Sequence, residues 1–205
     1  MKNEIILGDR VIGRNHPVFV IAEAGVNHNG DPATAKELII AAKHAGADCI
    51  KFQTFKAESV VTSSAPKADY QLITTDRNES QLQMLKKLEL DESVYEELIL
   101  TAAENDIYCI STPYNIEDLN FLDSLGVPAF KVASGQAVEY HFLKKIAEKK
   151  KPIILSTGMC TLGEVQTAVE IIRSTGNQDL VLLQCTTDYP THLEDCNLKA
   201  MKLME

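Results

Sequence analysis

The sequence lacks a surplus of basic residues. Its 205 residues include 20 Lys plus Arg against 29 Asp plus Glu, which gives a net charge of −9 with histidine neutral. Proteins that bind nucleic acids normally carry a basic surplus gathered on one face. We therefore expect no nucleic-acid partner.

Long apolar runs are also missing. No window approaches the roughly 18 consecutive apolar residues that a membrane-spanning helix requires. The N-terminal stretch MKNEIILGDRVIG contains no apolar segment of the length found in signal peptides. We expect no membrane partner and a cytoplasmic location.

Patterns typical of disulfides and metal sites are absent as well. The five cysteines are an odd number without a CxxC pair, so free thiols are expected (Cys49, Cys109, Cys160, Cys185 and Cys196). Four histidines show no HxH or HExxH spacing (His16, His44, His141 and His192). We predict no metal ligands within this chain.

An alternation of short apolar runs and helical patterns is present along the whole chain. The runs lie at residues 18–22, 48–52, 107–111, 129–133, 153–156 and 180–185. Capping residues punctuate the helices: Asp31 before Pro32, Asn115, and Thr161 with Glu164. The pattern predicts six βα units, and the helix of the sixth is expected over residues 195–204.

One interval between strands is too long for a single unit. Residues 54–90 are polar and rich in turn-forming residues, with a short helix expected near residues 80–88. Excursions of this kind in α/β proteins usually lie over the active site.

Polar residues follow every predicted strand. They are Glu23, Lys51, Gln53, Thr112, Lys131, Ser134, Ser156, Thr157 and residues 186–189. Barrels gather their sites at the C-terminal ends of all strands, whereas an open doubly wound sheet uses its switch point, and no GxGxxG follows the first strand. We therefore predict a (β/α)₈ TIM-barrel fold of which this chain carries about six units, a single domain over residues 1–205 that is incomplete at its C-terminus.

Lys51 lies within a predicted strand. Period-two geometry places Cys49, Lys51 and Gln53 on one face and Ile50 and Phe52 on the other. A buried ammonium requires a partner. One interpretation is a structural ion pair with Glu23, and the other is a ligand site.

Lys131 repeats this arrangement in a later strand. Two lysines near Ser134, Ser156, Thr157 and Thr112 favour a pocket for phosphate or another oxyanion. A lysine that forms a Schiff base is the rival interpretation, which borohydride trapping of pyruvate on Lys51 or Lys131 would reveal. His28 and Tyr189 are weaker candidates for substrate contact, since turn and strand-terminator roles explain their motifs equally well.

Eight motifs in register resemble the bacterial N-acetylneuraminate (sialic acid) synthase family. They are IAEAGVNHNG (21–30), DCIKFQT (48–54), APKADYQ (65–71), ESQLQMLKKLEL (79–90), STPYN (111–115), KVASG (131–135), LSTGM (155–159) and LLQCTTDYPTHLEDCNL (182–198). The resemblance implies a (β/α)₈ barrel followed by a small antifreeze-like domain, which we expect to lie outside these 205 residues. It also implies condensation of phosphoenolpyruvate with N-acetylmannosamine and release of phosphate.

The family's residue roles transfer to matching positions. The resemblance implies catalytic roles for Glu23, Lys51 and Lys131, of which the two lysines bind phosphoenolpyruvate. It implies further substrate contacts at Thr112, Ser134 and Ser156 on the phosphoenolpyruvate side and at Gln53, Thr187 and Tyr189 on the sugar side. Gln136 is a further predicted substrate contact. Two positions depart from the family pattern: Gln136 replaces an acidic residue and, as a neutral amide, cannot act as a base, and Thr187 replaces an Asn of some members.

Other features of the family are expected to lie outside these residues. The family uses Mn²⁺ or Mg²⁺ held by histidines of later barrel units, and it forms a homodimer through the antifreeze-like domain. Two alternatives to N-acetylneuraminate synthesis stay open. The first is legionaminic or pseudaminic acid synthesis from a related 2-acetamido hexose, and the second is a catalytically inactive fragment.

Overall fold

The chain folds into two compact units in the computed structural model, which describes residues 4–205. The first, here called the 19–127 unit, comprises Phe19–Val127. The second, here called the 128–205 unit, comprises Pro128–Glu205 together with the residues up to Val18.

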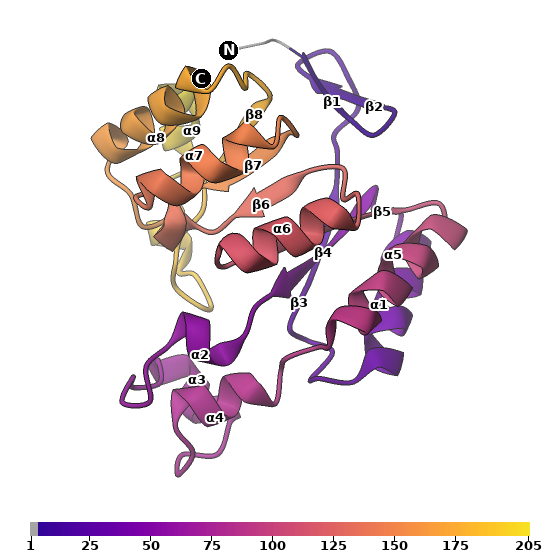
Figure 1. Cartoon of the computed structure of the whole chain (residues 1–205). Coiled ribbons are helices and arrows are strands. Elements are labelled where there is room, and N and C mark those ends of the chain that lie inside the picture. Colours follow the sequence, from indigo (N-terminus) through magenta and orange to yellow (C-terminus); the bar gives the residue numbers. More distant parts are fainter. Residues whose placement is uncertain (1–3) are drawn as a thin grey trace. The chain divides into compact units, whose positions relative to one another are not determined.

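Three parallel strands form the centre of the 19–127 unit, in the order β3-β4-β5. Helices α1 and α5 pack against each other and against these strands (Figure 1). The elements in chain order are β3 (Ile21–Gly25), α1 (Pro32–His44), β4 (Cys49–Thr54), α2 (Ala57–Val60), α3 (Asp69–Thr74), α4 (Gln81–Lys86), α5 (Glu92–Glu104), β5 (Tyr108–Pro113) and α6 (Ile116–Ser124).

Strand β4 separates an apolar face from a polar one. Ile50 and Phe52 belong to one core cluster with Ile39 of α1 and Leu98 of α5. Because side chains alternate along a strand, Lys51 lies on the face turned away from this core. The predicted facing of β4 is therefore confirmed, and its apolar half anchors the strand.

The 128–205 unit contains three parallel strands, in the order β6-β7-β8, and a separate antiparallel hairpin β1-β2. Helices α7 and α8 pack side by side. The elements are β1 (Glu4–Leu7), β2 (Arg10–Gly13), β6 (Phe130–Val132), η1 (Ser134–Gln136), α7 (Tyr140–Glu148), β7 (Ile153–Ser156), α8 (Leu162–Ser174), β8 (Leu180–Leu183), η2 (Leu193–Asp195), η3 (Leu198–Ala200) and α9 (Met201–Met204).

The predicted βα alternation is confirmed, with strand ends shifted by at most three residues. The helix starts follow from the predicted caps. The Asp31 side chain accepts from the backbone N–H groups of Ala33 and Thr34, and Asn115 accepts from the N–H of Asp118 at 2.7 Å. Thr161 and Glu164 form the expected reciprocal capping box.

Two local predictions were incomplete or wrong. The hairpin β1-β2 was missed, although Gly8 and Asp9 separate the apolar residues 5–7 from Val11 and Ile12, and Gly8 takes a φ of 63° in the turn. A helix expected over residues 195–204 is instead two 3₁₀ turns followed by the four residues of α9. Asn197 adopts a left-handed φ of 42°, which interrupts the helix.

The excursion over residues 54–90 holds the short helix predicted near residues 80–88, now α4, and two more short helices, α2 and α3. An ion-pair cluster ties its middle together. The Lys67 side chain, only 2% exposed, donates to Glu79 at 3.0 Å, and Lys87 donates to the other oxygen of that carboxylate at 2.5 Å. Lys67 also donates to Thr75 and to the Asp76 carbonyl oxygen, so the buried ammonium is well satisfied.

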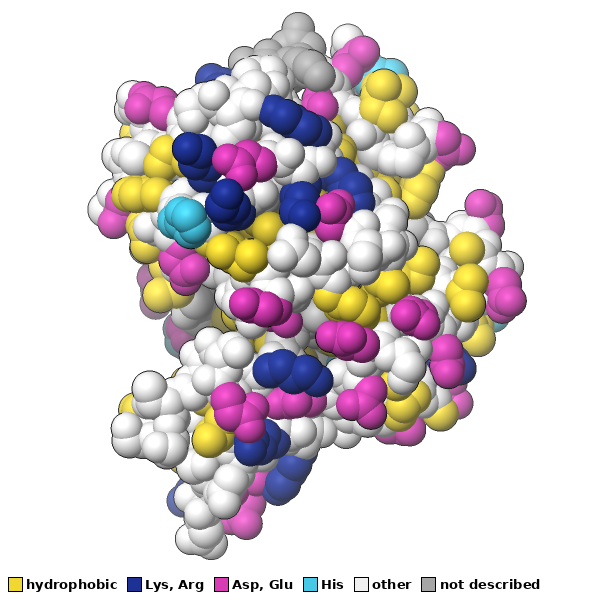
Figure 2. All heavy atoms as spheres, in the orientation of Figure 1, with side chains coloured by type: hydrophobic (Ala, Val, Ile, Leu, Met, Phe, Trp, Pro, Cys, Tyr) yellow, Lys and Arg dark blue, Asp and Glu magenta, His cyan; other side chains and the backbone are white. Residues whose placement is uncertain are grey.

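The charged surface is mixed in sign. Exposed ion pairs include Lys36–Glu97 at 2.7 Å and Lys86–Glu58 at 2.5 Å. Figure 2 shows acidic and basic side chains interspersed over the face that it draws. Exposed pairs of this kind each contribute at most about 1 kcal/mol to stability.

All five cysteines are free thiols, as predicted. Cys49 and Cys109 are buried, and Cys160, Cys185 and Cys196 are partly exposed. Burial raises the pKa of the Cys109 thiol to about 12, so this group is held in its neutral form.

Two glycines with a positive φ provide a test of local packing. A Cβ added at Gly30 (φ +77°) would overlap the backbone carbonyl oxygen of Lys87, whereas a Cβ at Gly46 (φ +83°) would meet nothing within 4 Å. We expect Gly46→Ala to lower the free energy of unfolding by about 1 kcal/mol through backbone strain alone. Gly30→Ala should cost about 2–4 kcal/mol, because the excursion must move. Urea unfolding of both variants measures the difference, and equal losses would contradict the proposed close contact.

Candidate functional site

Glu23 and Lys51 are opposite each other in the register of β3 and β4. The Lys51 Nζ lies 2.8 Å from Glu23 Oε2, and the Lys51 side chain is 8% exposed while that of Glu23 is 56% exposed. The structural ion pair considered from the sequence is therefore present. Because the carboxylate is open to solvent, the pair can also meet a ligand.

Thr112 and Gln53 belong to the same polar face. They are paired across β4 and β5, and the Lys51 ammonium donates to Thr112 Oγ1 at 3.5 Å. Thr112 is buried and Gln53 is half-buried. The structure thus brings together the four predicted site residues that the 19–127 unit contains: Glu23, Lys51, Gln53 and Thr112.

Gln53 is held by two tyrosines to which the sequence analysis assigned no role. The Tyr114 hydroxyl donates to Gln53 Oε1 at 3.3 Å, and the Tyr95 hydroxyl donates to the Gln53 backbone oxygen at 2.5 Å. Tyr114 packs edge-on against Phe55 with ring centroids 5.9 Å apart. Tyr114 belongs to the STPYN motif, which was the one available signal, but its contact with Gln53 required the fold.

Gly25 lies between the two polar side chains of this face. A Cβ at this position would lie 3.0 Å from Glu23 Oε1 and 3.5 Å from Gln53 Nε2, and its φ of +52° favours glycine. Because Gly25 has no side chain, its backbone is uncovered beside the Glu23 carboxylate and the Gln53 amide.

His28 is placed away from these residues. It is 1% exposed, and its ring lies 6.1 Å from that of Phe52, which faces the helices. Its Nδ1 accepts from the Gly30 N–H at 3.0 Å. Burial lowers the pKa of His28, and the ring packs beside Phe52. The substrate contact considered from the sequence stays a prediction.

The 128–205 unit holds the second set of predicted residues. Lys131 is 9% exposed, and its ammonium donates to the Val132 carbonyl oxygen at 2.8 Å. The hydroxyl groups of Ser134 and Thr187 lie 3.3 Å apart. The loop after β6 and the loop after β8 are thereby joined through these hydroxyls.

The remaining candidates differ in exposure. Ser156, at the end of β7, and Gln136, in η1, are buried, with 8% and 4% exposure. Tyr189 is 61% exposed. Ser156 and Gln136 thus belong to the packed part of this unit, whereas the aromatic ring of Tyr189 lies open.

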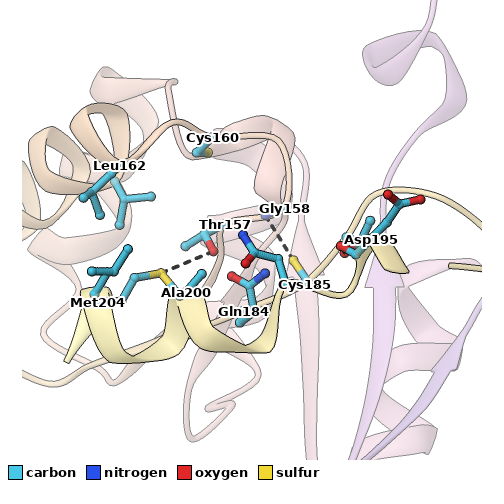
Figure 3. Close-up of a pocket in the computed structure, with 13 residues that line it drawn as sticks. Thr157, Gly158, Cys160, Leu162, Gln184, Cys185, Asp195, Ala200 and Met204 are labelled. Atoms are coloured by element: carbon cyan, nitrogen blue, oxygen red, sulfur yellow. Dashed lines mark hydrogen bonds between the residues drawn. The ribbon is translucent and has the colours of Figure 1, made fainter. Parts of the chain in front are cut away.

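A cavity of about 340 Å³ follows strands β7 and β8. Figure 3 shows six of the residues that line it. Thr157, Gly158, Cys160 and Cys185 come from the segments after β7 and β8, Ala200 from η3 and Met204 from α9. The Gly158 N–H donates to Cys185 Sγ at 3.1 Å, and Thr157 donates to Met204 Sδ at 3.6 Å. A Cβ at Gly158 would lie 2.8 Å from the Cys185 oxygen, so only glycine fits there.

Metal-ligating residues do not gather anywhere in residues 4–205. No group of three or more His, Cys, Asp or Glu in this range has an arrangement that could hold a metal ion. The residues described therefore do not fit the divalent cation that the family resemblance implies.

Over residues 4–205, no helix is both long and apolar enough to cross a membrane.

Comparison with known proteins identifies the family of this chain. Residues 38–205 match the sequence profile of the NeuB family. The chain belongs to the NeuB family. The predicted family and the barrel-type α/β fold are both confirmed.

Three similar proteins show how much sequence and structure this chain shares with its relatives. An N,N'-diacetyllegionaminic acid synthase of Campylobacter jejuni is 49% identical over 91% of this chain and 57% of its own length. A synthase of the same name from Legionella pneumophila is 43% identical over 98% of this chain and 58% of its own length. The crystal structure of a sialic acid synthetase from Leptospira borgpetersenii superposes with a TM-score of 0.86 at 32% identity, over 98% of this chain and 65% of the other. The chain thus spans less than three fifths of the two legionaminic acid synthases and about two thirds of the Leptospira protein.

Asp118 supports the backbone next to Tyr114. Its carboxylate accepts from the Tyr114 N–H at 3.3 Å and is 8% exposed. Desolvation by burial raises its pKa to about 6, against 3.8 for the ordinary group. Between these two values the folded state binds more protons than the unfolded state, so stability falls as pH rises from about 4 to about 6.

Replacing this carboxyl should remove the pH dependence. We expect Asp118→Asn to match the wild type near pH 4 and to exceed it at pH 7 by up to about 3 kcal/mol, since the amide oxygen still accepts from Tyr114. Urea unfolding from pH 4 to 7.5 measures this. Glu117→Gln removes an exposed carboxylate from the same turn and is the control with little expected effect. A gap between Asp118→Asn and wild type that does not widen with pH would refute the assignment.

Proposed function

We propose that this chain carries the phosphoenolpyruvate-binding residues of a nonulosonic acid synthase, an enzyme of surface polysaccharide biosynthesis. The observation that carries the proposal is the Lys51 ammonium, 2.8 Å from Glu23 and turned away from the apolar core. A desolvated ammonium favours anionic oxygens such as those of a phosphate or carboxylate. Membership of the NeuB family supports the same chemistry.

Each predicted residue has a role in this proposal. Lys51 and Lys131 bind the anionic groups of phosphoenolpyruvate, with help from hydroxyls at Thr112, Ser134 and Ser156. Glu23 pairs with Lys51 through one oxygen, and its second oxygen is available to a proton of the sugar or of water. Gln53, Thr187 and Tyr189 contact the sugar, and Gln136 is a neutral neighbour.

The reaction follows from the family resemblance. The methylene carbon of phosphoenolpyruvate attacks the aldehyde of the open-chain amino sugar and forms a C–C bond. Water adds to the resulting oxocarbenium carbon. The tetrahedral intermediate then loses phosphate through C–O cleavage, so that one phosphoenolpyruvate, one sugar and one water give one nonulosonic acid and one phosphate.

Two sugars are candidates for the acceptor. The sequence analysis favours N-acetylmannosamine, the precursor of N-acetylneuraminate. The 49% identity to a protein named N,N'-diacetyllegionaminic acid synthase supports a related hexose with two acetamido groups to an equal degree. A pseudaminic acid precursor is a third member of the same class, and a catalytically inactive binder of phosphoenolpyruvate is the remaining alternative.

Lys51 provides the test of the anion site. We expect Lys51→Met to weaken phosphoenolpyruvate binding by about 10-fold to 100-fold, the effect of losing one charge-assisted hydrogen bond. Lys36→Met removes an ion-paired lysine on α1 and should leave the affinity unchanged. Isothermal titration of the chain with phosphoenolpyruvate measures both. Equal affinities for wild type and Lys51→Met would rule out the proposed role.

Phosphate release distinguishes an enzyme from a binding fragment. The chain is incubated with phosphoenolpyruvate and Mn²⁺, with no sugar, with N-acetylmannosamine, or with a diacetamido hexose. Release that depends on one sugar supports synthase activity and identifies the acceptor. Phosphoenolpyruvate binding without release from either sugar supports the inactive alternative, and sugar-independent release contradicts the proposed condensation.

A further inference from the structure

The two ends of the Gln53 amide have different surroundings. Its oxygen accepts from the Tyr114 hydroxyl at 3.3 Å. Its nitrogen lies on the side of Gly25, where a Cβ would be 3.5 Å away. An amide carries two N–H donors at one end and an acceptor at the other, so its orientation decides what the site offers a ligand.

Glu23 also lies close to Gly25, as the Gln53 amide does. A Cβ at Gly25 would lie 3.0 Å from Glu23 Oε1, while Glu23 Oε2 is occupied by Lys51. The bare backbone of Gly25 is therefore flanked by one carboxylate acceptor and one amide donor. A vicinal hydroxyl and acetamido pair on a sugar has the complementary groups: an O–H that donates and an acetamido oxygen that accepts.

We infer that Tyr114 is a positioning residue that fixes the Gln53 amide with its NH₂ group toward Gly25 and Glu23, and that this orientation selects a 2-acetamido sugar. The inference rests on the proposed function. A phenol hydroxyl that donates to the amide oxygen stabilises one of two amide orientations of nearly identical shape. When a ligand occupies the space beside Glu23, Tyr114 still holds the amide from the far side.

Tyr114 is itself held in place from two directions. Its ring contacts Phe55 in an edge-on arrangement with an interplanar angle of 77°, and its backbone N–H donates to Asp118. The substitution Tyr114→Phe removes the hydroxyl and keeps the ring contact. The variant should therefore fold, and its effect should be confined to the Gln53 amide.

Nuclear Overhauser effects report the amide orientation without any ligand. In the wild type we expect contacts between the Gln53 side-chain NH₂ protons and the Gly25 Hα protons. These contacts should weaken in Tyr114→Phe and persist in Tyr108→Phe, which removes a hydroxyl from the start of β5, where the ring contacts Phe19. Unchanged contacts in Tyr114→Phe would overturn the inference.

Sugar binding then tests the consequence for specificity. We expect Tyr114→Phe to bind N-acetylmannosamine about five-fold more weakly, the effect of one hydrogen bond, with phosphoenolpyruvate affinity unchanged. In a Gln53→Ala background the same substitution should have no further effect. A loss of similar size in that background would show that Tyr114 does not act through Gln53.

The two measurements separate the inference from the proposed function. If the wild type binds no N-acetylmannosamine, the sugar assignment fails, and the Overhauser contacts alone decide whether Tyr114 orients Gln53. If the wild type binds the sugar and Tyr114→Phe binds it equally well, the proposed function stands and the selective role of Tyr114 is refuted.

Discussion

The ion pair between Lys51 and Glu23 is the contact on which the polar face of the 19–127 unit depends. An ammonium that is 8% exposed would be strongly destabilising without a partner, and the opposed carboxylate at 2.8 Å supplies one. Removing either group alone would leave a charge uncompensated. The Glu23 carboxylate therefore has two roles. It stabilises the buried Lys51 ammonium, and it remains more than half exposed, so that a ligand can reach it.

The alternation of side chains along β4 explains how such a pair is tolerated. Ile50 and Phe52 bury themselves against α1 and α5, which fixes the strand in its register. Lys51 and Gln53 are then obliged to face the other way. The Lys131 ammonium of the 128–205 unit is stabilised by a different kind of acceptor, since it donates to the Val132 backbone carbonyl oxygen at 2.8 Å.

Much of the local structure was predictable because it depends on near neighbours in the chain. The caps at Asp31, Asn115 and Thr161 satisfy backbone N–H groups two or three residues away, so their motifs are sufficient to place the helix starts. The expected helix over residues 195–204 failed for a related reason. A single left-handed residue, Asn197, interrupts it, and asparagine adopts that conformation only in some contexts.

The amino-acid sequence by itself determined the βα alternation, the facing of Lys51 and the family, since each depends on periodicity or on motifs in order. Only the tertiary structure decided that Tyr114 meets the Gln53 amide, that Gly25 leaves its backbone bare beside Glu23, and that His28 packs beside Phe52. The contacts of Tyr114 with Gln53 and of His28 with Phe52 join residues that are distant in the chain. The distances between these residues depend on how strands and loops pack, which no local sequence pattern predicts.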